Sequence, residues 1–215
     1  MPNLTLVIGN KNYSSWSLRP WLVLKHFDIE FTEVRIPLDQ PETKAQILQY
    51  SPSGMVPALI DEDLILWESI AICEYLVEQF PDRPLWSADP TARAIARAVS
   101  AEMHAGFLPL RRHMSMDMRS RYPGKGREPG VMENIERITM LWKECRTRFG
   151  TGGDFLFGEF SIADAMYAPV VSRFVTYGVE LDAIAQSYAD AIWNLPAMQE
   201  WIQAAEAETE VLVDH

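Results

Sequence analysis

The stretch Ser51-Pro-Ser-Gly-Met-Val-Pro-Ala-Leu-Ile60 predicts a loop that leads through a proline into a short strand. Pro57 has no N–H to donate to a sheet, so it is expected at the first residue of that strand. If the Val56–Pro57 peptide bond is cis, Val56 turns outward and offers its N–H and C=O to an extended peptide. The stretch therefore predicts an exposed backbone edge beside a sheet.

A second stretch, Trp67-Glu-Ser-Ile-Ala-Ile-Cys-Glu-Tyr-Leu76, follows a further apolar run at 64–66 and predicts a helix that opens at Glu68-Ser69. Its apolar positions are expected at Ile70, Cys73, Val77 and Phe80. A helix N-terminus carries free N–H groups and the positive end of the helix dipole, which favour an anion. A peptide edge beside an anion site indicates a receptor for a small peptide acid.

Composition limits the possible partners. The 215 residues suffice for one large or two small domains, and the net charge of −11 argues against nucleic-acid binding and membrane docking. No apolar run is long enough to span a bilayer, and Met1–Thr5 lacks the features of a signal peptide. Cys73 and Cys145 are isolated, as expected of buried thiols in a reducing compartment. We therefore expect a cytoplasmic protein without a metal.

The first eighty residues predict strand, helix, strand, helix, hairpin and helix. Leu4–Ile8 reads as a buried strand, and 31–36 as a second strand that pairs with it in parallel. Proline is tolerated in the first turn of a helix, so Pro20 predicts a helix start near Leu18 with Ser17 as N-cap. Ser14 and Ser15 are then expected in the loop before that helix.

This order is that of a thioredoxin-like α/β module at 1–80, and the Pro-rich segment 81–90 reads as a linker. Residues 91–215 predict an all-helical domain, with a long helix at 92–119 that is kinked at Pro109 and another at 131–149. Ser161 and Asp164 form a capping box ahead of a buried helix, and a last helix follows Pro196.

The run S-P-x-G-x-V-P-x-L followed by E-S-x-A-I-x-x-Y-L resembles the glutathione-binding half of the glutathione S-transferase family. The segment Phe160-Ser-Ile-Ala-Asp164 looks like that family's helix-capping motif. The resemblance implies a homodimer with glutathione as cosubstrate. It also implies that Val56 pairs with the cysteinyl backbone of glutathione and that Glu68 and Ser69 hold its γ-glutamyl end. The glutathione-binding residues implied in this way are Met55, Val56, Pro57, Glu68 and Ser69.

Glutathione chemistry needs a thiolate, which a serine hydroxyl stabilises by donating a hydrogen bond. The segment Ser14-Ser-Trp-Ser-Leu-Arg19 looks most like the zeta class, whose pattern is S-S-C-x-x-R. By that match Ser14 is the catalytic serine, Ser15 a neighbour in the thiol pocket, and Arg19 the family's arginine. The alternative is that these serines only cap helices and form turns.

The sequence departs from the zeta pattern at three positions. Trp16 replaces the cysteine, and Met55 replaces a glutamine. Zeta enzymes that isomerise maleylacetoacetate have an arginine seven residues beyond the proline that matches Pro169. Thr176 stands there in this chain, whereas Arg173 lies three residues earlier. The isomerase assignment therefore stays open.

The electrophile pocket is expected between the module and the helix from Ala92. Its predicted substrate-binding residues are Trp16, Met103, His104, Phe107, Arg111 and Arg173. The four at 103–111 recur at helical spacing, and they are equally consistent with core or dimer contacts.

Three functions remain open: a glutathione transferase, a glutathione-dependent cis–trans isomerase, and a non-catalytic binding or regulatory protein of the same fold. The serine pair argues against the third. A thioredoxin-like redox role is the weakest alternative, because no cysteine precedes the first helix.

Overall fold

The N-terminal half contains a four-stranded sheet in the order β2-β1-β3-β4. In the computed structural model, which describes residues 3–212, β1 (Leu4–Ile8) pairs in parallel with β2 (Thr32–Arg35). On its other side β1 pairs antiparallel with β3 (Ala58–Asp61), which forms a hairpin with β4 (Leu64–Trp67). This mixed sheet confirms the predicted thioredoxin-like topology and the parallel crossover between the first two strands.

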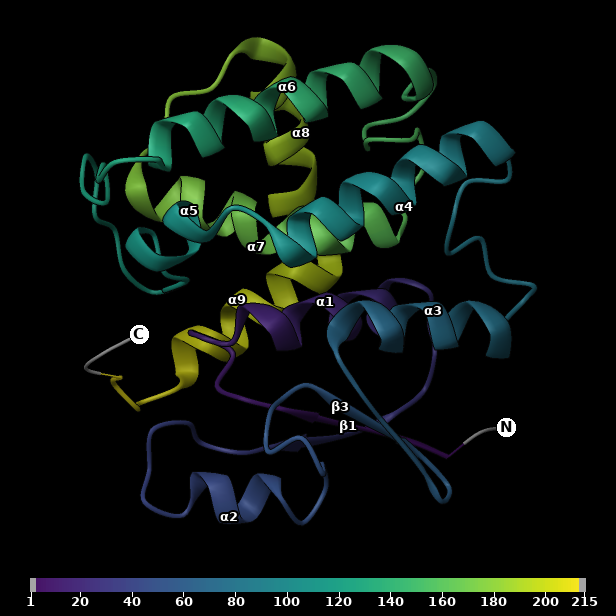
Figure 1. The fold of residues 1–215 in the computed structure, drawn as a ribbon, viewed down its shortest axis with the longest axis vertical. Coiled ribbons are helices and arrows are strands. Elements are labelled where there is room, and N and C mark those ends of the chain that lie inside the picture. The colour runs from purple at the N-terminus through teal and green to yellow at the C-terminus, as the bar shows by residue number, and fades with distance from the viewer. Residues whose placement is uncertain (1–2, 213–215) are drawn as a thin grey trace.

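Helices cover both faces of the sheet (Figure 1). The short helix α2 (Thr43–Ile47) packs on one face, where Val7, Ile47 and Ala58 belong to a small apolar cluster. The helices α1 (Ser15–His26) and α3 (Ser69–Gln79) lie on the other face. The larger core cluster extends from β1 through these two helices into the C-terminal half, so that α1 is enclosed between the sheet and the helical half.

The C-terminal half is all-helical. It contains α4 (Pro90–Ala105), α5 (Leu108–His113), α6 (Val131–Phe149), α7 (Ile162–Tyr177), α8 (Ala183–Trp193) and α9 (Pro196–Ala207). Helix α7 packs against α1 and is buried along almost its whole length. The predicted capping box is present at its start: the Asp164 carboxylate accepts a hydrogen bond from the Ser161 N–H at 2.9 Å. No helix within residues 3–212 is long and apolar enough to cross a membrane.

The predicted start of the first helix is wrong by three residues. Helix α1 begins at Ser15, with Ser14 at the N-cap position, and Pro20 lies in its interior. An interior proline costs about 3 kcal/mol, because it removes one backbone hydrogen bond and crowds the preceding turn. Every residue from Ser17 to Leu24 is buried. That packing outweighs the local preference, which sequence reasoning alone had followed.

The long helix predicted at 92–119 is also wrong, because it is two helices. The break lies at Gly106-Phe107, where Phe107 has a φ of 57°, and Pro109 occupies the first turn of α5. A Cβ at Gly106 would lie 2.7 Å from the Glu102 carbonyl oxygen, so a side chain does not fit there. In α3 the buried face contains Ile72, Cys73 and Leu76 rather than the predicted Ile70 and Val77, which are half-buried.

Candidate functional site

A pocket of about 200 Å³ opens between the β3 end of the sheet, the start of α3 and the helices α1 and α4. The Val56–Pro57 peptide bond at its wall is cis, and β3 begins at the next residue. Within residues 3–212 the backbone of Val56 makes no backbone hydrogen bond. The pocket is lined by Trp16, Ser53, Met55, Val56, Pro57, Trp67, Glu68, Ser69 and His104.

The start of α3 presents polar groups to this pocket. Ser69 is 1% exposed, yet its Oγ has no hydrogen-bond partner among residues 3–212. Glu68 has a φ of 71°, a conformation that a residue with a side chain seldom adopts. No acidic side chain lies in the first turn of α3. The free N–H groups of that turn and the Ser69 hydroxyl are therefore available to an anionic ligand.

Ser14 lies at the start of α1 without capping it. Its side chain accepts no hydrogen bond from the first turn of α1, and its hydroxyl donates to the Ser17 Oγ at 2.7 Å. Ser17 also accepts a hydrogen bond from the Gly9 N–H at 3.2 Å. If the Ser14 hydroxyl turned to a ligand, the Ser17 hydroxyl could donate to Ser14 in return. Sequence reasoning missed the contact between Ser17 and Ser14, because it treated Ser17 as the helix cap.

Ser15 is contacted by an arginine from the helical half. Arg173 of α7 donates from Nη2 to the Ser15 Oγ at 3.2 Å, and it is held by the carbonyl oxygens of Met114 and Pro169. Burial, together with the nearby charge of Arg111, lowers the pKa of Arg173 to about 10. The guanidinium therefore remains charged at neutral pH.

Two further arginines converge on the Trp16 ring. The Arg19 guanidinium lies 4.1 Å from the ring centroid, and that of Arg111 lies 4.8 Å from it. Arg19 is 1% exposed, its Nη1 has no partner among residues 3–212, and burial lowers its pKa. The ion pairs in that part of the chain include none between a carboxylate and Arg19, Arg111 or Arg173. The result is a cluster of three cations beside the pocket.

His104 bridges the arginine cluster and the start of α3. Its ring contacts Trp16 edge-on with centroids 5.1 Å apart, and its Nε2 lies 3.4 Å from a Glu68 carboxylate oxygen. Burial lowers the pKa of His104, and the charges of Arg19 and Arg111 lower it further, whereas Glu68 raises it. His104 is therefore neutral at pH 7.

The predicted site residues divide into three groups. Trp16, His104 and the whole predicted glutathione-binding set line the pocket. Four others lie outside the pocket lining. Ser14 and Ser15 stand at the start of α1. Arg111 lies against the Trp16 ring, and Arg173 contacts Ser15. Met103 is completely buried in the core, and Phe107 is nearly so. Thr176 donates a hydrogen bond to the Asp117 carbonyl oxygen.

Sequence reasoning missed two pocket residues, Ser53 and Trp67. Both stand inside the quoted motifs, one in S-P-S-G and the other directly before Glu68. Their position inside these motifs could have identified both residues as part of the pocket.

No group of three or more His, Cys, Asp or Glu side chains that could hold a metal ion occurs within residues 3–212. Cys73 and Cys145 are buried free thiols, and burial raises the pKa of each to about 12. Neither thiol is therefore suited to act as a nucleophile at neutral pH.

Two family models match the two halves of the chain. The glutathione S-transferase N-terminal domain matches residues 13–79, and the C-terminal domain of the same family matches residues 128–204. A probable maleylacetoacetate isomerase from Caenorhabditis elegans is 30% identical over 158 residues, which are 72% of this chain and 73% of the relative. The chain belongs to the glutathione S-transferase family.

Other comparisons agree with this placement. Glutathione S-transferase Z2 from Arabidopsis thaliana is 24% identical over 210 residues, which are 93% of each chain. A crystal structure of a glutathione transferase homologue from Burkholderia, with bound glutathione, superposes with a TM-score of 0.72 at 23% identity. The superposition covers 96% of this chain and all of that one. This similarity shows that the two proteins share a fold.

Proposed function

We propose that this protein binds glutathione in the pocket beside Val56 and Ser69 and transfers its thiolate to small electrophiles. The observation that carries the proposal is the buried Ser69 hydroxyl, which has no partner among residues 3–212 although it lies at the helix start inside the pocket. Buried hydroxyls are normally hydrogen-bonded. A γ-glutamyl carboxylate at this helix N-terminus supplies the acceptor, and Val56 offers its backbone to the cysteinyl residue.

The thiolate is stabilised at the start of α1. In the free protein the Ser14 hydroxyl donates to the Ser17 Oγ. On binding, the Ser14 hydroxyl turns to the sulfur and donates to it, and the Ser17 hydroxyl reverses and donates to the Ser14 Oγ. A donor that is itself hydrogen-bonded in this way is polarised and becomes a stronger donor. Stabilising the charged form lowers the pKa of the thiol, so that the nucleophile exists at neutral pH.

The cation cluster supports a second candidate function, a glutathione-dependent cis–trans isomerase that acts on an electrophile with a carboxylate. Arg19 and Arg111 lie against the Trp16 ring and Arg173 contacts the neighbouring Ser15, and no ion pair within residues 3–212 joins any of the three to a carboxylate. An acidic electrophile would supply such a carboxylate. In that case Arg173 binds the substrate carboxylate in place of the zeta-class arginine, whose position is occupied by Thr176 in this chain. In such a reaction glutathione adds to the double bond and leaves again unchanged.

The proposal also covers the domain boundaries, the oligomeric state and the cellular location. The segment 81–90 separates the glutathione-binding domain, 1–80, from the helical domain, 91–215. The edge strand β4 exposes Leu64, Ile65 and Trp67, which supports a homodimer in which these apolar side chains are covered. Buried, unpaired thiols support a cytoplasmic location.

The binding proposal is tested by calorimetry with glutathione and, as a matched ligand, cysteinylglycine, which lacks the γ-glutamyl group. Glutathione should bind and raise the melting temperature, and cysteinylglycine should bind far more weakly. If neither ligand produces heat at millimolar concentration, glutathione is not a ligand and the non-catalytic alternative stands.

The activation mechanism is tested by the pH dependence of kcat/KM with an aryl halide. We expect Ser14→Ala to shift the profile to higher pH and to lower kcat/KM at neutral pH by about 10- to 100-fold. That is less than the full loss for a buried oxyanion donor, because this thiolate forms in the ground state. A shift in Ser15→Ala instead would move the role by one residue, and no shift in either variant would contradict serine activation.

The two reactions are separated by assaying conjugation of an aryl halide and isomerisation of maleylacetoacetate in parallel. If the protein is a glutathione transferase, conjugation should be efficient and isomerisation weak. Efficient isomerisation that is lost in Arg173→Ala, with conjugation retained, would instead establish the second candidate.

A further inference from the structure

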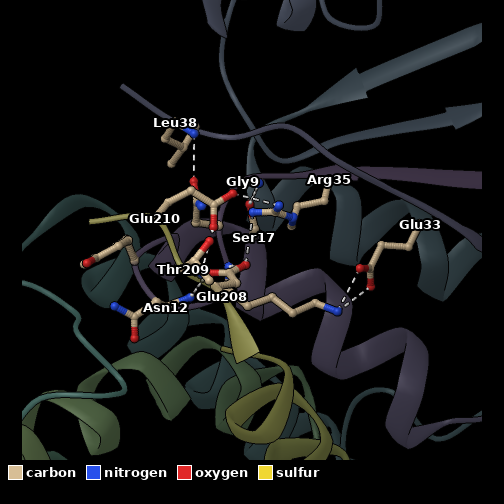
Figure 2. Close-up of polar contacts among 12 residues, drawn as sticks. Gly9, Asn12, Ser17, Glu33, Arg35, Leu38, Glu208, Thr209 and Glu210 are labelled. Carbon is tan, nitrogen blue, oxygen red and sulfur yellow. Dashed lines mark hydrogen bonds and ion pairs between the residues drawn. The ribbon is translucent and has the colours of Figure 1, made fainter. Parts of the chain in front are cut away.

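A segment far away in the chain holds the loop that leads into Ser14. Glu208 follows the last residue of α9, and its carboxylate faces the backbone of Lys11 and Asn12. Figure 2 shows Glu208 beside Asn12. Its Oε1 accepts a hydrogen bond from the Lys11 N–H at 2.7 Å, and its Oε2 accepts one from the Asn12 N–H at 3.0 Å. The Glu208 side chain is only 7% exposed. One carboxylate thus satisfies two consecutive peptide groups.

Cationic side chains hold this carboxylate in place. Arg35 of β2 lies with its Nη1 3.4 Å from the Glu208 Oε1, and its Nη2 pairs with the Glu210 carboxylate at 2.8 Å. Arg119 donates to the backbone carbonyl oxygens of both Glu208 and Glu210. We call residues 208–210 the tail segment. It is fixed by its backbone as well as by its charges.

The loop between β1 and Ser14 is fixed on its other sides too. The Ser14 N–H donates to the Asn10 carbonyl oxygen at 2.8 Å. The Lys11 carbonyl oxygen accepts a hydrogen bond from the Trp201 indole at 2.8 Å. The Asn12 amide oxygen accepts one from the Arg119 N–H at 2.9 Å. The N–H groups of Lys11 and Asn12 find their hydrogen-bond acceptors in the tail segment, in the carboxylate of Glu208.

We propose that Glu208 is a positioning residue for Ser14: its carboxylate fixes the peptide groups at 11 and 12 and so aims the Ser14 hydroxyl at the glutathione sulfur. This inference rests on the proposed function. Ser14 follows Asn12 by two residues, so a rotation of that peptide displaces the hydroxyl. Small displacements of a catalytic donor have large effects on rate.

A carboxylate suits this task better than an amide. Both of its oxygens accept hydrogen bonds, so it satisfies two N–H donors that point in the same direction. A glutamine offers one oxygen, and its NH₂ group would face the second N–H. Glu208→Gln therefore keeps the size of the side chain while it releases one peptide group of the loop.

The test compares Glu208→Gln with Glu210→Gln, which removes the same charge from the same segment without touching the loop N–H groups. Titrating the ultraviolet absorbance of the thiolate of bound glutathione gives its pKa in each variant. We expect Glu208→Gln to raise that pKa by about one unit and to lower kcat/KM below that pKa about tenfold. Glutathione affinity should stay within about twofold, and Glu210→Gln should match the wild type.

The direction of the shift separates positioning from simple electrostatics. Removing a negative charge near a thiol favours the thiolate and lowers its pKa, so a raised pKa in Glu208→Gln cannot come from the lost charge. Equal thiol pKa values in the two variants, with only a lower melting temperature in Glu208→Gln, would overturn the proposal and leave Glu208 a structural residue.

A second variant keeps the proposal open to refutation if Glu208→Gln does not fold. Glu208→Asp retains both acceptor oxygens at a shorter reach, and its thiol pKa should lie between those of the wild type and Glu208→Gln. An unshifted pKa in folded Glu208→Asp would then overturn the proposal. A wild-type protein that binds glutathione without forming a thiolate would refute serine activation itself, and positioning with it.

Discussion

The helices α1 and α7 both begin next to a serine, and the two starts are built differently. At α7 the Asp164 carboxylate accepts hydrogen bonds from the Leu156 N–H, the Ser161 N–H and the Ser161 hydroxyl, at 2.9–3.1 Å. At α1 the Ser14 side chain caps no helix N–H group, and within residues 3–212 its hydroxyl donates only to the Ser17 Oγ. The polar groups at the start of α7 find their hydrogen-bond partners within the protein. At the start of α1 the Ser14 hydroxyl is paired, among the described residues, only with a neighbouring hydroxyl, which the proposed ligand replaces.

Helix α3 belongs with α1 in this comparison. The Ser69 hydroxyl is buried and unpaired among residues 3–212, and Glu68 before it has a positive φ. A helix without a capping side chain is less stable by about 1 kcal/mol. Both uncapped serine starts belong to the proposed glutathione site, whereas the capped start lies inside the helical half. At these two starts, unlike at α2, α5, α6 and α9, which also lack a capping side chain within residues 3–212, the proposed ligand completes the hydrogen bonding.

The capped start should be the more costly to break. We expect Asp164→Asn to lower the free energy of unfolding by about 3 kcal/mol, because an amide cannot accept all three hydrogen bonds and leaves buried donors unpaired. Urea denaturation measures this loss. Folded Asp164→Asn should still bind glutathione with the wild-type affinity, since the carboxylate is remote from the pocket. A loss below about 1 kcal/mol would mean that the capping box is not a main support of α7.

The uncapped start of α3 should behave in the opposite way. Ser69→Ala should weaken glutathione binding about tenfold, as the loss of one hydrogen bond to a carboxylate implies. The unfolding free energy of the free protein should be unchanged or slightly higher, because a buried unpaired hydroxyl is removed. Calorimetry and urea denaturation of the same samples give both quantities. A clear loss of stability without a loss of affinity would reverse the assignment.

The pH dependence of stability sharpens the comparison. Burial raises the pKa of the Asp164 carboxyl to about 6, although its hydrogen bonds act in the opposite direction. A group whose pKa is higher in the folded state stabilises the fold below its unfolded pKa, and this stabilisation is lost as the pH rises through the folded value. The stability advantage of the wild type over Asp164→Asn should therefore grow by about 1 kcal/mol from pH 7 to pH 5. An advantage that shrinks on acidification would contradict the raised pKa.

The smallest expected effect concerns the two N-cap serines. Ser161→Ala should cost about 1 kcal/mol of stability, whereas Ser14→Ala should cost less than about 0.5 kcal/mol, because its hydroxyl caps no N–H group. Thermal denaturation of the matched pair measures the difference. Equal losses would show that Ser14 supports the fold as much as Ser161 does, and its proposed freedom to serve glutathione would be lost.

Short-range signals account for most of what could be predicted from the sequence. The strand Leu4–Ile8, the helix start at Ser69 and the capping box at 161–164 were all located correctly, because each depends on residues within one turn or one strand. The predicted glutathione-binding residues likewise lie close together in the sequence, between Met55 and Ser69, so that they could be assigned to one pocket without any knowledge of the helical half.

The failures arise where distant packing overrides a local rule. Pro20 lies inside α1 because both the sheet and α7 bury that helix, and no feature of residues 14–24 reports this. Helix α8 was missed altogether. The contact of Arg173 with Ser15 joins residues 158 positions apart, and only the folded chain brings them together.

The contact of Glu208 with the loop at residues 11–12 has a consequence for the order of synthesis. These groups are separated by 197 positions in the chain. At a translation rate of about 5–20 residues per second, roughly 10–40 seconds pass between the appearance of Lys11 and that of Glu208. During that interval the sheet and α1 can form on the ribosome, but the loop that leads into Ser14 lacks its two hydrogen bonds to Glu208. The nascent module should therefore acquire its thioredoxin-like shape well before Glu208 can position Ser14 in the way proposed.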